Sequence, residues 1–294
     1  MHNLFNTIGI IGKYSDPRIT KTIASVHDFL CKKEYKVIVD SKSAAILSQP
    51  SIKSSDAESL GKSCDLIIAI GGDGTFLAAT RAIVDFNIPL IGINLGRLGF
   101  LVDISPDQIQ YKLDDILQGK YLEEKRYLLQ ATIIRDEQVI HQETAVNEVV
   151  VHRWITPSMI EIVTRINGVY LNSQRSDGLI ISTPTGSTAY SLSAGGPILH
   201  PTLNALILVP LNPHTLSNRP IVIDDSSEIE ISFCQTKQIN ALVTCDHLEI
   251  PKVSINDKIL IRRLPTPIKI LHPEDHDFFN ILRKKLNWSS GYHN

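Results

Sequence analysis

The chain has 294 residues, of which 43% are hydrophobic and 20% are charged, and its formal net charge is −2. A chain of this length, with a mean hydropathy of +0.03, can fold into one large or two medium domains with a sizeable core. The near-neutral charge and the dispersed Lys and Arg residues argue against a nucleic-acid groove and against a basic membrane-binding face.

The four cysteines, Cys31, Cys64, Cys234 and Cys245, lie far apart and form no CxxC pair. This spacing argues against a zinc site and against a disulfide framework, and it is typical of a protein in a reducing cytosol. The first seven residues lack the basic region and apolar run of a signal peptide, and no apolar stretch approaches the ~20 residues of a membrane span. We therefore expect a cytoplasmic protein with no membrane partner and no nucleic-acid partner.

The N-terminal third alternates predicted strands with predicted helices. Short apolar runs followed by segments with apolar residues at helical spacing are typical of βαβ units. Such units imply a parallel sheet with right-handed crossovers, and ligands of these sheets bind outside the C-terminal ends of the strands. The predicted strands cover residues 8–11, 36–40, 66–70 and 87–94, and the predicted helices cover residues 19–30, 44–47 and 76–84.

The predicted strand at residues 66–70 ends in the loop Gly71-Gly72-Asp73-Gly74-Thr75, and a predicted helix follows. Strand, glycine turn and helix together present backbone N–H groups to a phosphate, and glycines let a ligand approach the backbone closely. Asp73 is unusual in a loop suited to anions. A carboxylate is expected there if Asp73 binds a metal beside the phosphate or takes a proton from an attacking hydroxyl. The alternative is that Asp73 only caps the helix.

After residue 125 the pattern changes to closely spaced short strands with few helical signals between them. Asn167-Gly168 separates two of these strands and is a strong signal for a two-residue hairpin turn. Strands at this spacing favour a β-sandwich or a related stacked β domain. The predicted strands cover residues 128–135, 148–152, 160–166, 169–173, 178–183, 205–209, 221–224, 228–234, 241–245, 259–263 and 268–271.

The last segment returns to a helical pattern, with Phe278, Ile281, Leu282 and Leu286 on one face. A single helix after a β domain must bury that face, and the simplest place is back on the first domain. We therefore expect an α/β domain with a parallel sheet and a β-rich, sandwich-like domain. The predicted boundaries are residues 1–124 plus 274–294 for the α/β domain and residues 125–273 for the β-rich domain.

Two short segments beside predicted strand ends are candidate nucleotide contacts. Residues 94–100 contain two glycines and end in Phe100, whose ring could stack on a base; the alternative is an ordinary loop with one aromatic residue in the core. The dipeptide Asn147-Glu148 could hold a ribose diol through its amide and carboxylate. A lone dipeptide is a weak signal, and a strand-entry turn explains it more simply.

The segment 175–193 carries the densest set of polar groups in the sequence. Arg175 offers a bidentate fork for phosphate and Asp177 an acceptor for an amide or hydroxyl. The serines and threonines around Gly186 are small donors that packing alone explains poorly. No GxSxG elbow surrounds them, and Leu77 occupies the third glycine position of a dinucleotide fingerprint.

With these segments assembled, the chain resembles the NAD kinase family. The glycine loop alone is shared with lipid kinases and phosphofructokinases, whereas the serine/threonine block and residues 213–220 are much more specific. The matching segments occur in the family's order and are residues 71–75, 94–100, 147–148, 177–190, 193–196 and 213–220.

The resemblance implies that ATP, with a divalent metal such as Mg²⁺, phosphorylates the 2′-hydroxyl of the adenosine ribose of NAD and gives NADP. It implies an α/β domain, a β-rich domain for NAD binding and oligomerisation, and a C-terminal helix packed on the first domain. NAD is expected between the domains of a cytoplasmic homodimer or homotetramer, with no dedicated protein site for a metal. The rival interpretations are a lipid or sugar kinase with the same loop and a non-catalytic NAD(P)-binding sensor.

The resemblance also assigns roles to individual residues. Asp73 matches the proton acceptor, although the sequence leaves open whether it takes the proton or only orients the hydroxyl. The residues implied to bind NAD are Asp73, Gly74, Phe100, Asn147, Glu148, Arg175, Asp177, Thr188, Ala189, Tyr190, Ser191, Leu192, Ser193 and His247, and those implied to bind the ATP phosphates are Gly71, Gly72, Gly74 and Thr75.

Two positions depart from the family pattern. His247, which ends a predicted strand, stands where many relatives carry Gln or Gly-Gln. Pro157 and Ser158 stand where relatives often place a basic residue that reaches the ligand. These departures concern the contacts from two loops and leave the reaction itself unchanged.

Overall fold

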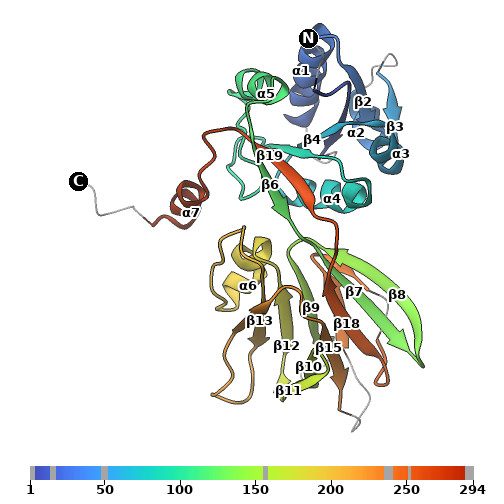
Figure 1. Ribbon diagram of the computed structural model, residues 1–294, viewed down its shortest axis with the longest axis vertical. Helices are drawn as coiled ribbons and strands as arrows, with labels where there is room; N and C mark the ends of the chain where they lie inside the picture. The colour runs from blue at the N-terminus through green and yellow to red at the C-terminus, as the bar shows by residue number, and fades with distance from the viewer. Residues whose placement is uncertain are drawn as a thin grey trace. The chain divides into compact units, whose positions relative to one another are not determined.

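The computed structural model describes residues 4–13, 18–47, 52–154, 158–234, 241–250 and 253–288. The chain divides into two compact units, Met1–Lys125 together with Ile268–Asn294, and Arg126–Pro267. The first unit is an α/β domain and the second is built from strands (Figure 1). The predicted combination of fold classes is confirmed.

The first unit is built on a seven-stranded sheet in the order β3-β2-β1-β4-β5-β19-β6. Its strands are β1 (Thr7–Gly12), β2 (Lys36–Asp40), β3 (Ser54–Ser55), β4 (Leu66–Ile70), β5 (Leu90–Ile93), β6 (Leu122–Arg126) and β19 (Ile268–His272). From β3 through β19, neighbouring strands of this sheet pair in parallel. β4 is buried along its whole length, because a central parallel strand is covered on both faces.

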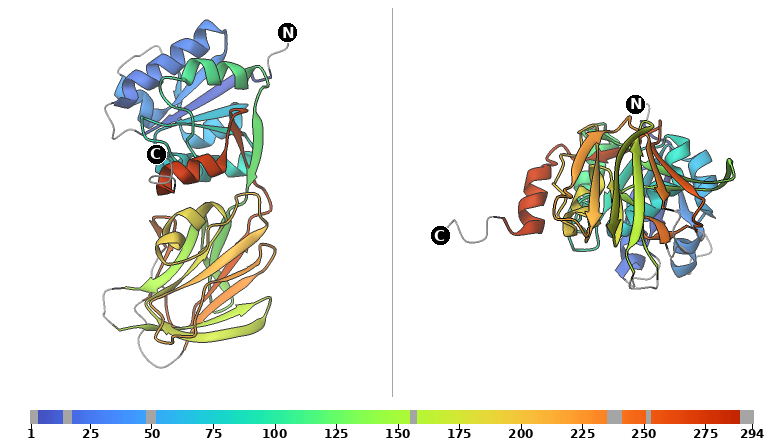
Figure 2. Two further views of the ribbon diagram at one scale, coloured as in Figure 1. Left: turned by 90° about the vertical axis from the view of Figure 1, so that its left-hand side faces the viewer. Right: turned by 90° about the horizontal axis from the view of Figure 1, so that it is seen from below.

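Helices lie on both faces of this sheet (Figure 2). They are α1 (Arg18–Lys32), α2 (Ser41–Leu47), α3 (Ala57–Ser63), α4 (Asp73–Ile83), α5 (Ile109–Leu117) and α7 (Phe278–Leu286), with a short 3₁₀ turn, η1, at Val84–Phe86. α1 contacts α5, and α3 contacts α4. α1 buries Ile19, Ile23, Val26 and Leu30, which follow the helical spacing seen in the sequence.

The strand at Ile268–His272 corrects one expectation. The sequence placed residues 268–271 among the strands of the β-rich domain, but β19 joins the first sheet beside β5, with Ile270 opposite Leu90. β6, which the sequence did not indicate as a strand, lies next to β19 in the same sheet. A strand's hydrophobicity shows that it is buried, but it does not show in which sheet.

The C-terminal helix belongs to the first unit, as predicted. α7 buries Ile281 and Leu282, and its N-cap is Asp277, whose carboxylate accepts hydrogen bonds from the backbone N–H groups of Phe279 and Asn280. Lys285 in its last turn donates a hydrogen bond to the carbonyl oxygen of Leu98 at 3.1 Å. The helix therefore contacts the loop that follows β5.

The second unit contains two six-stranded sheets, in the orders β11-β10-β15-β18-β7-β8 and β14-β13-β12-β9-β16-β17. The strands are β7 (Leu129–Arg135), β8 (Gln138–Ala145), β9 (Glu148–Arg153), β10 (Ile160–Ile166), β11 (Val169–Ser176), β12 (Gly178–Ser182), β13 (Ala205–Leu211), β14 (Ile221–Asp224), β15 (Ile229–Phe233), β16 (Ala241–Cys245), β17 (Leu248–Glu249) and β18 (Lys258–Arg263). Neighbouring strands of both sheets pair antiparallel, and residues of both sheets share one buried core. This is the sandwich-like arrangement that the strand spacing predicted.

Tight turns connect several strands of this unit. Asn167 and Gly168 both have positive φ, at 51° and 77°, as the predicted two-residue hairpin between β10 and β11 requires. Asp136 and Glu137, with φ of 49° and 60°, make a similar turn between β7 and β8, which the sequence did not reveal. Within the described residues, no helix is both long and apolar enough to cross a membrane.

Candidate active site

The glycine loop lies where β4 ends and α4 begins, at the C-terminal edge of the parallel sheet. The helix starts at Asp73, three residues before its apolar part, so Gly72 is its N-cap and Gly74 lies in its first turn. Gly72 and Gly74 are exposed, and a Cβ atom on either would meet only open space. The N-terminus of α4 is therefore accessible to an anion, which the helix dipole and free backbone N–H groups stabilise.

The carboxylate of Asp73 does not cap its own helix. Gly72 occupies the N-cap position, and no side-chain hydrogen bond caps α4. Instead, the two Asp73 oxygens accept hydrogen bonds from the backbone N–H groups of Phe100 and Leu101, each at 3.0 Å. The helix-cap interpretation is wrong, because Asp73 joins the glycine loop to the loop after β5.

Gly99 makes this contact possible. A Cβ atom at residue 99 would lie 2.2 Å from Oδ1 of Asp73 and 2.5 Å from Cγ2 of Val102. A larger residue would have to displace the carboxylate. Gly99 thus allows a close approach between two loops of the same unit, whereas a Cβ atom at Gly96 would meet open space.

Phe100 lies between the glycine loop and α7. Its backbone N–H binds Asp73, and the ammonium group of Lys285 lies 5.3 Å from its ring centroid. A cation at this distance from an aromatic face is attracted by the ring quadrupole. The half-buried Phe100 is therefore fixed at both its backbone and its side chain, as a stacking platform requires.

In the second unit, the Asn147-Glu148 turn is held by Asp246. The Asp246 carboxylate accepts hydrogen bonds from the backbone N–H groups of Val146, Asn147 and Glu148 at 3.1, 2.8 and 3.3 Å. Asp246 sits in the turn between β16 and β17 with φ of 53°, so β16 delivers its carboxylate to the start of β9. The sequence did not identify this role, because the partners are almost a hundred residues apart.

Glu148 is a buried carboxyl group with an unusual protonation equilibrium. Burial, and then the neighbouring Asp246 carboxylate, raise its pKa from 4.5 to about 8, while a hydrogen bond from the backbone of Tyr190 acts in the opposite direction. Its Oε2 atom is buried without a hydrogen-bond partner among the described residues. An unpartnered buried acceptor with a raised pKa is typical of a functional site.

The serine/threonine block mostly stabilises its own loop. Thr183 donates to the carbonyl oxygen of Val146 at 2.7 Å and accepts from the N–H of Gly186 at 3.1 Å. Ser187 donates to the carbonyl oxygen of Pro184 at 2.6 Å and accepts from the N–H of Leu199 at 3.0 Å. The expectation that this whole block offers free donors to a ligand is therefore wrong for Thr183 and Ser187.

An open pocket of about 600 Å³ in the second unit gathers several of the predicted residues, Asp177 and Tyr190 among them, and Asp246 also lines it. Asp177 is already paired: its carboxylate binds Arg153 at 2.8 Å and accepts from the side-chain amide of Asn212 at 2.9 Å. Arg153 and Asn212 also line this pocket, and neither was predicted from the sequence as a site residue.

The remaining predicted residues of this unit are distributed around the same elements. Thr188 ends the 3₁₀ turn η2 (Thr185–Thr188), and the residues from Tyr190 to Ser193 form the short helix α6. Ser191 is fully buried, with no hydrogen-bond partner for its hydroxyl among the described atoms. Arg175 is exposed on β11, and neither it nor His247 is among the residues that line the pocket.

The two loop departures noted in the sequence have different outcomes. His247 is exposed in the tight turn between β16 and β17, next to Asp246. Pro157 lies outside the described residues, whereas Trp154 lines the pocket and Ser158 is exposed.

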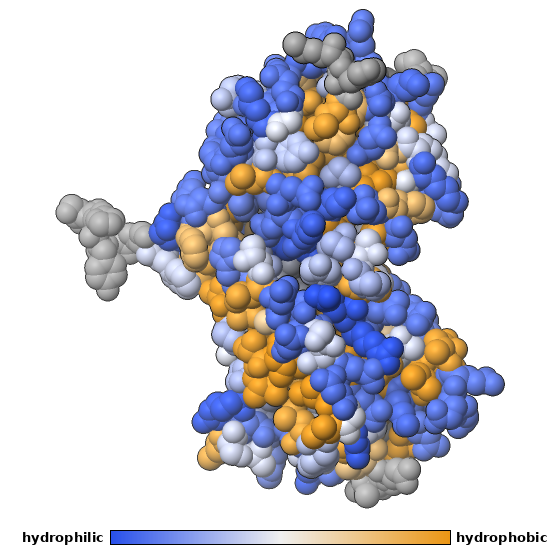
Figure 3. Space-filling view, viewed as in Figure 1, coloured by the Kyte–Doolittle hydropathy of each residue, from blue (hydrophilic) through white to orange (hydrophobic). Residues whose placement is uncertain are grey.

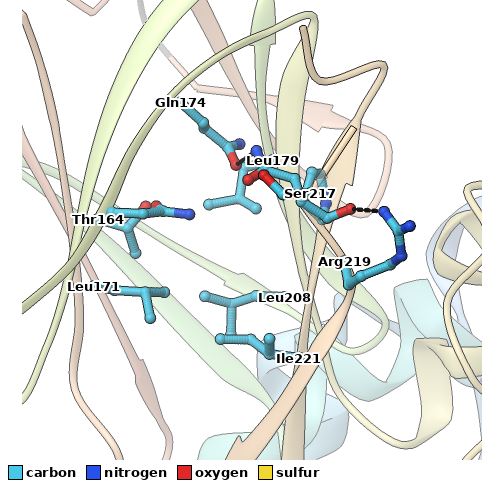
Figure 4. Close-up of a pocket in the computed structure, with 11 residues that line it drawn as sticks. Thr164, Leu171, Gln174, Leu179, Leu208, Ser217, Arg219 and Ile221 are labelled. Carbon is cyan, nitrogen blue, oxygen red and sulfur yellow. Dashed lines mark hydrogen bonds between the residues drawn. The ribbon is translucent and has the colours of Figure 1, made fainter. Parts of the chain in front are cut away.

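A second, smaller pocket of about 230 Å³ opens beside the two edge strands of the sandwich (Figure 4). It is lined by apolar side chains such as Leu171 and Leu208 and by polar ones such as Gln174 and Arg219. Asn218 donates to the Gln174 side chain at 3.3 Å. Residues 217–219 of the family-specific segment 213–220 therefore line this pocket.

Comparison with protein families finds two domain models along the chain. Residues 8–121 match the model of the ATP-NAD kinase N-terminal domain, and residues 146–272 match that of the ATP-NAD kinase C-terminal domain. The C-terminal model ends at His272, so it includes β19.

Curated relatives match over almost the entire chain. The chain is 52% identical to the NAD kinase of Methylococcus capsulatus over 290 residues, covering 99% of this chain and 100% of that protein. It is 48% identical to the NAD kinase of Nitrosomonas europaea over 286 residues, covering 97% of this chain and 96% of that protein.

Solved structures show the same fold. Yeast NADH kinase, in complex with NADH, superposes with a TM-score of 0.90 at 24% identity, covering 99% of this chain and 90% of that one. The Archaeoglobus fulgidus NAD kinase, in complex with ATP, gives a TM-score of 0.72 at 25% identity, covering 96% of this chain and 98% of that one. Both domain models and the extent of identity show that this chain belongs to the NAD kinase family.

Proposed function

We propose that the chain catalyses transfer of the γ-phosphoryl group of ATP to the 2′-hydroxyl of the adenosine ribose of NAD, giving NADP and ADP. The observation that carries this proposal is the position of Asp73, a carboxylate fixed by two backbone N–H groups between two open glycines at a helix N-terminus. The family relationship supplies the substrates, and this geometry supplies a place for the reaction.

The first unit binds ATP and supplies the proton acceptor. The backbone of Gly71, Gly72 and Gly74 and the hydroxyl of Thr75 contact the phosphates, and ATP enters as its Mg²⁺ complex. The 2′-oxygen forms a bond to the γ-phosphorus while the bond from that phosphorus to the bridging oxygen of ADP breaks. The hydroxyl proton passes to Asp73, late in a loose transition state.

Phe100 and Gly74 complete the adenosine side of this site. The ring of Phe100 is fixed by Lys285 and by the Asp73 contact, so the adenine stacks on a surface that is already in place. A preorganised contact of this kind costs less conformational entropy on binding than a mobile side chain.

The second unit holds the rest of NAD. Asn147 and Glu148 hold a ribose diol, and the unpartnered Oε2 of Glu148 accepts a hydrogen bond from one hydroxyl. Asp177 and Tyr190 contact the dinucleotide from the pocket that they line. Arg175, His247 and the residues from Thr188 to Ser193 complete this set of NAD-binding residues.

The protein acts in NADP biosynthesis in the cytoplasm as a homodimer or homotetramer. Support for self-association comes from apolar side chains on the surface of the β-rich unit, some of which are seen in Figure 3. Four free cysteines are consistent with a reducing compartment.

The direct test incubates the purified protein with ATP, Mg²⁺ and NAD and measures NADP with an NADP-specific dehydrogenase. We expect NADP to form only when all three are present, and an Asp73→Asn variant to form far less. NAD binding without turnover would support the sensor interpretation. Phosphorylation of a sugar or a diacylglycerol in preference to NAD would support the other rival, and either result would overturn the proposal.

A further inference from the structure

Four titratable side chains form a cluster in the first unit that the proposed reaction does not use. Asp103 lies in the loop after β5, Glu124 on β6, His272 at the end of β19 and His276 just before α7. Their side chains are 10%, 16%, 1% and 8% exposed in that order. Four segments of the first unit therefore meet at one buried polar site.

Asp103 binds both imidazole rings on one side. One oxygen of its carboxylate, Oδ2, lies 2.8 Å from Nδ1 of His272 and 2.7 Å from Nδ1 of His276. An ionised carboxylate only accepts hydrogen bonds, so both histidines must carry their proton on Nδ1.

In the neutral ring the other nitrogen, Nε2, carries a lone pair. Both Nε2 atoms are buried without a hydrogen-bond partner among the described residues. They face the same oxygen of Glu124, at 3.9 Å from His272 and 4.0 Å from His276, which is too far for a hydrogen bond. Two buried lone pairs that face a carboxylate repel it unless a positive charge lies between them.

The spacing is compatible with a shared metal ion. Zinc binds imidazole nitrogen and carboxylate oxygen at about 2.0–2.2 Å in tetrahedral geometry, so two donors on one ion lie about 3.4 Å apart. The distances to Glu124, 3.9 and 4.0 Å, exceed this value by about half an ångström. The rings are stacked with centroids 3.8 Å apart, and they need only tip their Nε2 atoms together while Nδ1 stays on Asp103.

The hydrogen-bonding pattern around the cluster points the same way. Histidines that bind a metal usually donate their other ring N–H to a carboxylate, which fixes the tautomer and the ring orientation. Asp103 does this for both rings at once.

We propose that this cluster is a structural site for a divalent transition metal of the zinc class, bound by Nε2 of His272, Nε2 of His276 and the carboxylate of Glu124. Asp103 positions the two histidines. The ion connects β6 and β19 to the segment that leads into α7, and so fixes the C-terminal helix. It is separate from the Mg²⁺ that accompanies ATP, and the sequence alone gave no signal for it.

The test measures Zn²⁺ binding to metal-free protein, without nucleotides, by competition with a chromogenic chelator. It uses a Cys31→Ser background, because Cys31 and His27 lie 3.7 Å apart on α1 and could bind zinc themselves. We expect one Zn²⁺ per chain and a higher melting temperature on binding. Glu124→Gln and His276→Gln should each weaken binding at least tenfold, whereas Glu123→Gln, an exposed neighbour on β6, should not.

A second measurement uses Co²⁺ in place of Zn²⁺ and records its visible absorption, which reports imidazole ligands directly. Circular dichroism of each metal-free variant confirms that it is folded. No stoichiometric binding by the parent, or equal binding by the parent and both ligand variants, would overturn the proposal and would mean that protons alone neutralise the cluster. Neither measurement depends on kinase activity, so this result is independent of the proposed reaction.

Discussion

In the proposed reaction Asp73 takes a proton, and in the structure it also holds the loop at Phe100 and Leu101. One substitution cannot separate these two roles. Both of its oxygens accept a backbone N–H, and an asparagine would offer only one acceptor oxygen. Asp73→Asn therefore removes basicity and also loosens the loop at Phe100 and Leu101. A second variant is needed that disturbs the loop but keeps the carboxylate.

Val102→Ala is that variant, because the fully buried Val102 packs in the same loop and accepts the N–H of Gly99, and its truncation leaves the Asp73 carboxylate in place. If Asp73 takes the proton, kcat of Asp73→Asn should fall ~10²–10⁴-fold, the usual contribution of general-base assistance. Val102→Ala should lower the melting temperature and reduce kcat much less. Equal losses of kcat in the two variants would show that Asp73 only holds the loop. The comparison needs kcat, NAD affinity and melting temperature for both proteins.

Glu148 makes stability depend on pH in a defined direction. The folded protein keeps its proton up to about pH 8, whereas the unfolded chain loses it near 4.5. Between these values the folded state binds more protons than the unfolded state, so stability falls as pH rises through this window and stays level above it. Below about 4.5 both states are protonated and the group has no further effect.

Glu148→Gln should remove this dependence. We expect the variant to melt close to the parent at pH near 4.5 and at a higher temperature than the parent above pH 8, where the parent holds an unpaired buried charge. Thermal unfolding in the absence of nucleotide measures both. Glu249→Gln, on the exposed strand β17, is the control. A difference between parent and Glu148→Gln that does not change with pH would contradict the assignment.

At the scale of elements, α7 buries two side chains, Ile281 and Leu282, and its Lys285 binds the loop after β5. Leu282 is 3% exposed and Phe279 is 58% exposed, although both lie on the same short helix. Leu282→Ala should cost about 2–5 kcal/mol, the usual effect of removing a buried leucine side chain. Phe279→Ala should change stability by no more than about 0.5 kcal/mol.

Chemical denaturation of the two α7 variants distinguishes burial from helix propensity. Alanine favours helix at either position, so a loss confined to Leu282→Ala reports packing alone. Similar stabilities of the two variants would mean that α7 does not pack on the sheet. Because Lys285 contacts Phe100, we expect Leu282→Ala to raise the KM for NAD as well.

At the scale of the whole molecule, the apolar surface of the β-rich unit needs an explanation. Val169 and Tyr170 on β11 and Val222 on β14 are exposed, and Leu216 in the intervening family-specific segment is 92% exposed. β11 and β14 are the end strands of their sheets. Exposed apolar side chains on edge strands are typical of a protein interface.

We expect this surface to contact a second copy of the chain. Tyr170→Asp should shift the protein to a smaller assembly in multi-angle light scattering, because burying a charge at an apolar interface is costly. Tyr111→Asp, an exposed tyrosine on α5 of the other unit, should leave the assembly unchanged. A parent protein that is monomeric at micromolar concentration would contradict the proposed homo-oligomer.

Much of the fold could be predicted from local sequence patterns. The runs at 36–40 and 66–70 match β2 and β4 to the residue, and the Asn167-Gly168 hairpin has the predicted positive φ angles. Hydrophobic period and turn chemistry are properties of neighbouring residues, so the sequence displays them directly. α5 and β8 were missed, although α5 buries Leu113 and Ile116.

The candidate site was only partly visible in the sequence. The glycine loop, Asp73 and Asn147-Glu148 stood out because their residue types are unusual for their local setting. The tertiary structure decided the partners of these groups. Asp73 binds the loop at Phe100, and Asp246 holds the turn at Asn147. Thr183 and Ser187 bind backbone groups of the protein. Each of these hydrogen bonds joins residues that are distant in the sequence, so the local residue pattern does not show it.

The sequence by itself determined the family, the two fold classes and the position of the glycine loop. Motif order and hydrophobic period can be read from the sequence without knowing which residues are in contact. Only the tertiary structure decided that β19 joins the first sheet and that Asp103, Glu124, His272 and His276 meet. Sheet membership and side-chain clusters depend on which buried surfaces pair across long separations in sequence. A hydrophobic or titratable residue does not carry that information in its own neighbourhood.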